Sequence, residues 1–359
     1  MKGMIVTVLL AVLLTTGAKA VELPRDLLDA APKGTERLLE DADISGAEGF
    51  LQGFRRILDR AREEGAEILR QRLKDVAALL VVVLLCGAIE SFYQGTGSKI
   101  TLFLPMAAAL SVTLLTAGSL DALIGLGAQT IRELSLFSKA LLPTLAAAAA
   151  TAGAVTTATF QQVSAMFLVD LLLTLIEGFL MPMVYLYIGV LTASCCMPEN
   201  RLGTIAEGLK KALTWVLTTS LLAFTIYLSV VKVISGAADG TSVKLTKAAI
   251  SGVVPVVGGI IADAAETVLA GAGLLKNTIG IFGVLAVIAV CVYPFLQLGI
   301  QYLLYKVTAF LASAVGAPGI CKLIDGLGSA FGLVLGMTGA CAVLLLVSVL
   351  SLIAAVLPW

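Results

Sequence analysis

The sequence predicts an all-α, polytopic membrane protein with about six to nine membrane segments. Hydrophobic residues make up 59% of the 359 residues and charged residues only 13%, about half the charged share of a soluble domain. The charges are also unevenly distributed. Residues 21–75 carry 23 charges in 55 residues, whereas residues 76–359 carry 23 in 284 residues. A short charged segment therefore precedes a long apolar one, and uncharged runs of about 20 residues are typical of membrane-spanning helices.

Residues 1–20 match a secretory signal peptide. Lys2 provides the basic start, residues 4–16 are apolar, and Ala18-Lys19-Ala20 fits a small-x-small cleavage site. An uncleaved signal anchor is the alternative interpretation. In both cases residues 21–75 are expected to be extracytoplasmic.

The charged segment, residues 21–75, is expected to contain an amphipathic helix. Ser45 and Glu48 form a capping box, and the apolar residues behind them recur at helical spacing. The candidate partner-contact positions on this helix are Phe50, Phe54, Ile57, Arg60 and Leu69. The alternative is a solvated helix that packs on its own membrane domain. No proline separates this helix from residues 76–92, so we expect it to continue into the first membrane segment.

Residues 76–359 are expected to form one multi-pass membrane domain. Its hydrophobic segments are 76–93, 100–119, 140–158, 163–195, 213–235, 248–275, 277–316 and 327–357. Two of them exceed one simple span, and the prolines in them, Pro182 and Pro294, are expected to kink or break the helix. Basic residues flank segment 213–235 on both sides, so the positive-inside rule gives no orientation.

The membrane domain carries signs of a parallel internal repeat, residues 138–235 and 250–357. Pro143 and Pro182 are 39 residues apart, and so are Pro255 and Pro294. In addition, the motif 207–209 (EGL) matches the motif 325–327 (DGL) in the same order. Chance similarity within an apolar sequence is the alternative.

Each half begins with a segment rich in proline and small residues, which is typical of discontinuous helices that line a polar path and also of tight helix packing. Acidic residues occur in both halves, and a charge in hydrocarbon costs at least about 2.5 kcal/mol. They are expected either to line a polar or proton-coupled path, or to lie near helix ends and in internal ion pairs. The candidate polar-path or broken-helix positions are Pro143, Asp170, Glu177, Gly252, Pro255, Gly258, Gly259, Asp263 and Glu266.

The residue inventory argues against an enzyme. The chain has no histidine, which excludes a Ser-His-Asp triad and histidine ligation of zinc or haem. Its six cysteines include no CxxC pair, and no P-loop is present. We therefore expect no catalytic residues, no metal site and no cofactor. The net charge of zero also argues against binding to nucleic acid.

Residues 247–277, together with Gly280 and Gly283, resemble the most distinctive block of the stage III sporulation protein AE family. The order of signal peptide, charged segment and multi-pass domain resembles that family as well. The resemblance implies a membrane component of the secretion-like channel, or feeding tube, between mother cell and forespore in endospore-forming bacteria. It implies location in the mother-cell membrane around the forespore. The partners that it implies are other stage III sporulation membrane and ring proteins and a secretion-type ATPase, besides the lipid bilayer.

Two other functions remain open on the residues alone. A self-sufficient secondary transporter of a small solute would explain the acidic residues and the repeat. A structural membrane scaffold would need neither.

Overall fold

The computed structural model describes residues 46–93, 100–151, 155–197, 201–253, 258–314 and 318–353, together with Leu27. Between residues 232 and 276 it describes only the helical backbone. The helices are α4 (Gly46–Tyr93), α5 (Ile100–Thr151), α6 (Val155–Leu175), the π-helical turn η1 (Ile176–Leu180), α7 (Met181–Cys196), α8 (Arg201–Val253), α9 (Gly258–Ala314) and α10 (Pro318–Ile353). The predicted signal peptide, the capping box at Ser45 and most of segment 21–45 lie outside the described residues.

The all-α membrane class is confirmed. Within the described ranges every element is helical, and six helical rods are long and apolar enough to cross a bilayer. The longest, α9, has 57 residues. At 1.5 Å per residue it measures about 85 Å, more than twice the roughly 30 Å of a hydrocarbon core. The long helices therefore extend well beyond one bilayer thickness.

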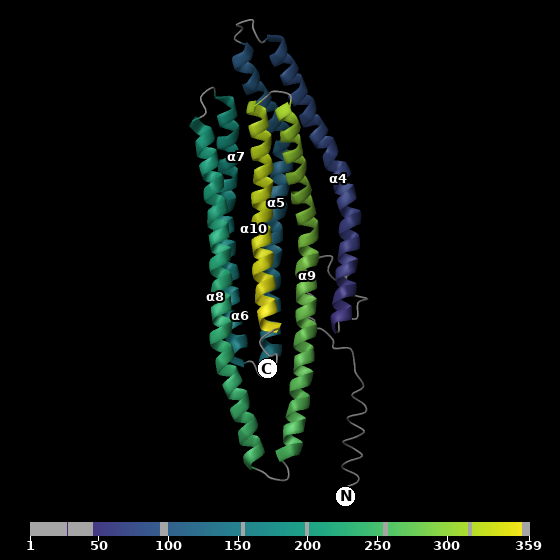
Figure 1. Cartoon of the computed structure of the whole chain (residues 1–359), viewed down its shortest axis with the longest axis vertical. Helices are drawn as coiled ribbons and strands as arrows, with labels where there is room; N and C mark the ends of the chain where they lie inside the picture. The colour runs from purple at the N-terminus through teal and green to yellow at the C-terminus, as the bar shows by residue number, and fades with distance from the viewer. Residues whose placement is uncertain are drawn as a thin grey trace.

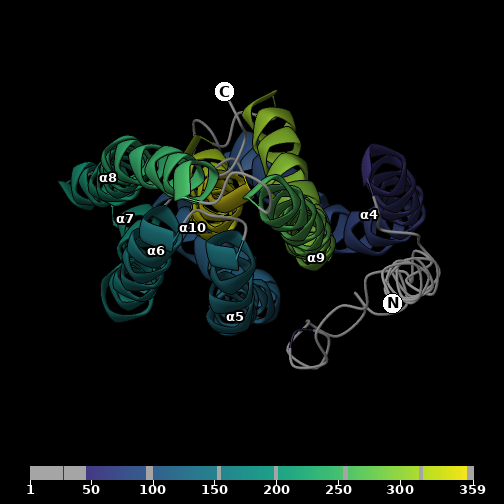
Figure 2. The same cartoon turned by 90° about the horizontal axis from the view of Figure 1, so that it is seen from below.

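The rods lie roughly side by side along the long axis of the molecule (Figure 1). Seen along that axis, α10 lies at the centre, among α5, α8 and α9, whereas α4 lies at the periphery next to α9 (Figure 2). Aromatic pairs join these helices. Phe137 of α5 meets Phe282 of α9 edge to face, and Tyr305 of α9 meets Phe331 of α10 with ring centroids 5.2 Å apart. All four of these side chains are buried.

The helices are less interrupted than the prolines predict. Pro143 lies inside α5 and Pro294 inside α9, and both helices continue past them. Of the alternatives open on the sequence, a break at Pro294 and a discontinuous helix at Pro143 are therefore wrong. An internal proline costs about 3 kcal/mol, but fully buried leucines on either side of Pro143, Leu142 and Leu145, hold the segment in the bundle.

The helical rod accommodates Pro182 in a different way, through a π-helical turn. The five-residue π-helical turn η1 ends two residues before it, so α6, η1 and α7 form one rod from residue 155 to residue 196. A wider turn of this kind relieves the clash between a proline ring and the carbonyl one turn earlier. The segment predicted as 163–195 is therefore a single span that contains a π-helical turn.

The predicted hydrophobic segment 248–275 is divided between two helices. α8 ends at Val253 and α9 begins at Gly258, and the two helices run antiparallel (Figure 1). Gly252 is thus near the end of one helix, and Gly258 and Gly259 start the next. Pro255 lies outside the described residues.

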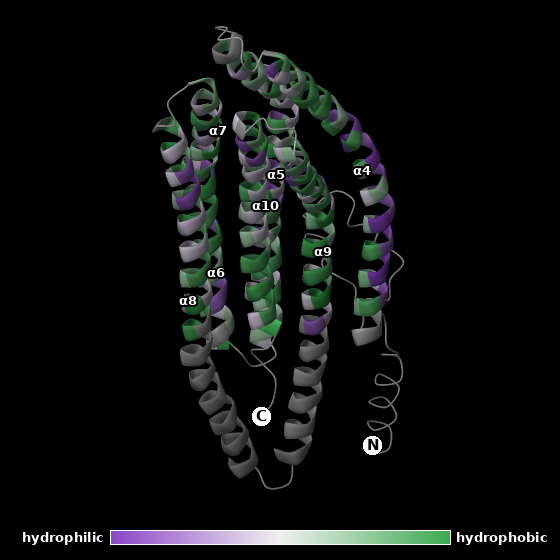
Figure 3. Ribbon diagram, turned by 45° about the horizontal axis from the view of Figure 1, so that its top comes forward, coloured by the Kyte–Doolittle hydropathy of each residue, from purple (hydrophilic) through white to green (hydrophobic). Residues whose placement is uncertain are grey.

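α4 confirms the expectation of one continuous helix through residues 46–93. It packs on α9 and α5. Its buried positions, Ile57, Ile68, Val76, Leu79 and Val83, follow a helical spacing. Figure 3 shows the hydrophilic half of this helix beside the more hydrophobic α9.

Candidate functional site: a cationic pocket at one end of the bundle

A cavity of about 1340 Å³ lies between the hairpin of α7 and α8 and the hairpin of α9 and α10. It is close to the C-terminal ends of α7 and α9 and the N-terminal ends of α8 and α10, at one end of the bundle. The charged residues that line it are Glu207, Lys210, Lys211, Lys306, Lys322 and Asp325. The pocket lining therefore contains four positively charged and two negatively charged side chains.

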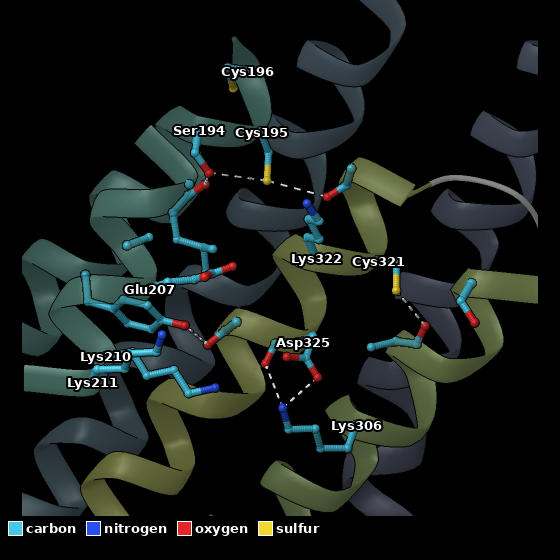
Figure 4. Close-up of a pocket in the computed structure, with 18 of the residues that line it drawn as sticks. Ser194, Cys195, Cys196, Glu207, Lys210, Lys211, Lys306, Cys321, Lys322 and Asp325 are labelled. Atoms are coloured by element: carbon cyan, nitrogen blue, oxygen red, sulfur yellow. Dashed lines mark hydrogen bonds and ion pairs between the residues drawn. The ribbon is translucent and has the colours of Figure 1, made fainter. Parts of the chain in front are cut away.

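Lys306 of α9 and Asp325 of α10 form the ion pair of the pocket. The Nζ atom of Lys306 lies 2.6 Å from Oδ1 of Asp325 (Figure 4). The same ammonium also donates to the hydroxyl of Ser329, at 3.1 Å, and lies 5.7 Å from the ring centroid of Tyr302. Asp325 and Ser329 are one helical turn apart, so both face α9.

Lys210 of α8 meets this cluster from the other hairpin. Its Nζ atom donates to the hydroxyl of Ser329 at 2.9 Å, and that hydroxyl donates to the carbonyl oxygen of Asp325. Two ammonium groups thus share one neutral oxygen, while a single carboxylate balances only one of them. The pocket therefore has an excess of positive charge.

Side chains also hydrogen-bond to backbone carbonyls beside the pocket, both between the two hairpins and within the α9–α10 hairpin. The hydroxyl of Tyr187 in α7 donates to the carbonyl oxygen of Gly326 in α10, at 3.1 Å. Nearby, Cys195 donates to the carbonyl oxygen of Gly319, and Cys321 donates to that of Ala309. These contacts hold the pocket walls together independently of the charged side chains.

The two sequence motifs matched as a repeat both contribute to this cavity. Glu207 lies near the start of α8 and Asp325 near the start of α10. The matched motifs thus occupy similar places in two hairpins that face each other across the pocket.

The predicted acidic positions Asp170 and Glu177 do not form a site with each other. Each is paired with a base on α5: Asp170 lies 3.2 Å from Lys139, and Glu177 lies 2.5 Å from Arg132. Among the alternatives open on the sequence, this arrangement corresponds to internal ion pairing.

The other predicted path positions are not brought into the pocket by any described contact. Pro143 lies within α5 and does not line the cavity. The backbone places Asp263 and Glu266 in α9, but their side chains lie outside the described part of the structure, as does Pro255.

The predicted partner-contact positions on α4 divide into two sets. Ile57 is buried, and Phe50 and Phe54 stack at 6.1 Å between ring centroids and are partly buried. Arg60 and Leu69 are exposed, and Arg60 pairs with Glu64. Part of the predicted surface therefore packs within this chain.

Sequence reasoning did not select the pocket residues. Lys306, Lys322 and Asp325 are the only charged residues after position 276, and the last two lie between the predicted hydrophobic segments 277–316 and 327–357. Isolated charges that flank a loop between two apolar segments were the available signal. Ser329 carries no such signal, because serine is common in membrane helices. In the described part of the chain, no group of acidic residues and cysteines is placed to hold a metal ion.

Six long apolar helical rods around a shared core define a polytopic helical membrane protein. Comparison with known proteins makes the assignment more specific. The profile of the family Stage III sporulation protein AE matches residues 53–356, and the chain belongs to that family.

A curated relative, Stage III sporulation protein AE of Bacillus subtilis (strain 168), is 25% identical over 256 residues. This match covers 70% of the present chain and 63% of the relative, so the chain spans less than two thirds of that protein's length. No solved structure matches the chain.

Proposed function

We propose that this protein is the polytopic membrane component of a secretion-like channel complex between mother cell and forespore. Its expected place is the mother-cell membrane around the forespore. Its expected partners are other stage III sporulation membrane and ring proteins and a secretion-type ATPase. Family membership supports the proposal, and one structural observation carries it: the charged half of α4 lies beside a charge-free stretch of α9.

The register of this contact follows from two glycines of α4. A Cβ atom at Gly53 would touch Leu285, and one at Gly65 would lie 3.6 Å from Cδ2 of Leu296. Both contacts have nearly the same offset in residue number, so the two helices run parallel. Further along, Arg72 donates two hydrogen bonds to Oε1 of Gln297.

The two facing segments differ sharply in charge. Residues 55–75 of α4 contain twelve charged residues, whereas residues 285–305 of α9 contain none. Ten of the twelve are exposed. If residues 285–305 of α9 cross the bilayer, this charged surface lies at the same depth.

A charged surface at that depth is incompatible with lipid. Each charge at the bilayer centre costs at least about 2.5 kcal/mol, and such residues normally face water or protein. The chain by itself leaves the surface uncovered. In a larger assembly, other proteins can cover the charged surface, or a water-filled path can run along it. In both cases the charges do not face lipid.

Orientation follows from the same proposal. If the chain before residue 55 lies outside the cytoplasm and α4 crosses the bilayer beside α9, this crossing carries the chain inward, and the end of the bundle that holds the pocket lies in the mother-cell cytoplasm. The basic residues there, Arg201, Lys210, Lys211 and Lys322, then agree with the positive-inside rule. On that side they would also face a cytoplasmic ATPase.

The test is gentle extraction of the tagged full-length protein from its sporulating host, followed by size analysis and identification of what co-purifies. We expect a large assembly that contains ring proteins and a secretion-type ATPase. The double variant Arg55→Glu/Arg62→Glu reverses two exposed charges on the α4 surface and should release those partners. Arg55→Lys/Arg62→Lys keeps the charge and should retain them.

A small homo-oligomer free of these partners, under conditions that preserve other membrane complexes, would refute the channel-component proposal. Reconstituted solute flux that depends on Asp263 and Glu266 would then favour a secondary transporter. Normal assembly and spore formation by the Arg55→Glu/Arg62→Glu variant would show that the charged α4 surface is not needed for the proposed function.

A further inference from the structure

We propose that the cationic pocket binds the headgroup of an acidic phospholipid, with the phosphate held by Lys210 beside the Lys306–Asp325 pair. This inference depends on the protein lying in a membrane and not on the proposed channel role. It would hold equally for a scaffold or a transporter.

The charge balance of the pocket points to an anion. Asp325 neutralises Lys306, but no described carboxylate forms an ion pair with Lys210, whose hydrogen bond goes to Ser329. From their distances to this shared oxygen, the two ammonium nitrogens are at most about 6 Å apart. Lys210 is therefore the cation of this cluster without a counterion, and an ammonium in a partly buried site beside a second cation attracts an anionic group.

The hydrogen-bonding capacity of the site points to a group with several acceptor oxygens. The Ser329 hydroxyl accepts from both lysines and donates its proton to the carbonyl oxygen of Asp325. It is therefore saturated. Lys306 already donates to Oδ1 and the carbonyl oxygen of Asp325 and to Ser329, whereas Lys210 has three N–H donors and donates one described hydrogen bond. The oxygens of a phosphate can accept from the remaining donors of Lys210.

The surroundings of the pocket select a lipid over a free anion. Two large apolar side chains line the cavity and remain exposed: Trp215 of α8 is 68% exposed and Phe310 of α9 is 74% exposed. Aromatic residues near a membrane surface favour the level of the lipid headgroups. Acyl chains can lie against these side chains while the phosphate reaches Lys210.

The position of the pocket between helices also agrees with the way membrane proteins bind acidic lipids. Basic pockets between membrane helices bind acidic headgroups, and each basic residue near the surface contributes a similar increment of affinity. Free phosphate shares the anionic chemistry but would gain nothing from Trp215 and Phe310. The two sources can therefore be distinguished by experiment.

Trp215 provides a direct reporter. The chain has two tryptophans, Trp215 and Trp359, so the Trp359→Phe variant leaves Trp215 as the sole one. This full-length variant is placed in nanodiscs of phosphatidylcholine that contain either brominated phosphatidylglycerol or brominated phosphatidylcholine at the same mole fraction. Bromine quenches tryptophan fluorescence only at short range, so quenching measures the lipid next to Trp215.

We expect stronger quenching by the brominated acidic lipid. Lys210→Gln should weaken this preference about fivefold. The Lys210→Gln substitution leaves no carboxylate of the pocket cluster unpaired, because Asp325 remains paired with Lys306. Lys210→Arg should retain the preference, and so should the matched control Lys74→Gln, which removes an exposed lysine of α4 outside the pocket.

Three results would overturn the proposal. The first is equal quenching by the acidic and the neutral brominated lipid. The second is a preference for the acidic lipid that Lys210→Gln leaves unchanged. The third is abolition of the preference by inorganic phosphate at an ionic strength matched with chloride, which would assign the site to a free anion.

A competition experiment keeps the proposal testable if Lys210→Gln fails to fold. Unbrominated phosphatidylglycerol should then relieve quenching of the Trp359→Phe protein by the brominated acidic lipid, and added phosphatidylcholine should not. Equal relief by both lipids would contradict a headgroup-specific site.

Discussion

Gly328 of α10 lies directly against Tyr305 of α9. A Cβ atom at position 328 would be 2.9 Å from the Cβ of Tyr305, and the backbone carbonyl of Tyr302 would be 3.7 Å away. Neither neighbour is the flexible end of a side chain. This close approach sets the spacing of the two central helices beside the pocket.

We therefore expect Gly328→Ala to destabilise the protein by about 1–3 kcal/mol, as is typical of overpacking. Thermal unfolding of the detergent-solubilised protein measures this. Gly189→Ala in α7 is the matched control, because a Cβ there meets nothing within 4 Å and alanine is the better helix former. A Gly328→Ala protein as stable as Gly189→Ala would show that α9 and α10 are less tightly packed.

The Lys306–Asp325 pair should be strongly coupled in a double-mutant cycle. Removal of one partner leaves the other charge without its counterion in a partly buried pocket, whereas removal of both does not. Because both side chains are partly exposed, we expect Lys306→Gln or Asp325→Asn to cost about 1–2 kcal/mol each. The double variant should recover part of that loss in the same unfolding assay. Additive losses would contradict a direct interaction.

The ion pairs between α5 and the α6–η1 rod should be structural. Since Asp170 and Glu177 each have a basic partner on α5, neutralising a complete pair leaves no unpaired charge. We expect Asp170→Asn/Lys139→Gln to form spores at the normal frequency, and Glu177→Gln/Arg132→Gln likewise. Loss of sporulation by a paired variant whose protein accumulates normally would instead favour a proton-coupled role for that acid.

The neighbouring residues Ile57 and Leu58 of α4 test how this helix is held. Ile57 is 2% exposed and Leu58 is 51% exposed. Ile57→Ala should destabilise the purified protein by about 2–5 kcal/mol or release α4 to limited proteolysis, whereas Leu58→Ala should do neither. Equal effects of the two substitutions would mean that α4 is not docked on α9 through Ile57.

The class of fold could be predicted from local sequence because it depends on local properties. Long uncharged runs identify membrane helices without any knowledge of their neighbours. The absence of proline between Phe50 and Phe92 likewise predicts the continuous helix α4, which the structure confirms. The sequence left a kink or a break open at Pro294, and a discontinuous helix or tight packing open around Pro143, whereas the structure has continuous helices at both positions. The energetic effect of a proline in a helix depends on the packing on either side of it.

The candidate site could not be predicted in this way. Arg132 and Glu177 are 45 residues apart in sequence, and Lys210 and Ser329 are 119 apart. Nothing in the local pattern around Asp170 or Glu177 reveals that their partners lie on α5. The motif similarity between residues 207–209 and 325–327 was the nearest indication that the two hairpins share a site.

The sequence by itself determined that this chain is a helical membrane protein with a charged N-terminal region, and its family. The length of apolar runs, the distribution of charges and the order of motifs are properties of the linear sequence and do not depend on tertiary contacts. Only the tertiary structure decided which charges neutralise each other, that the charged half of α4 lies beside apolar α9, and that Lys210 and Lys306 meet at one hydroxyl. Coulomb interactions and hydrogen bonds depend on separation in space, and that separation exists only once the helices have packed.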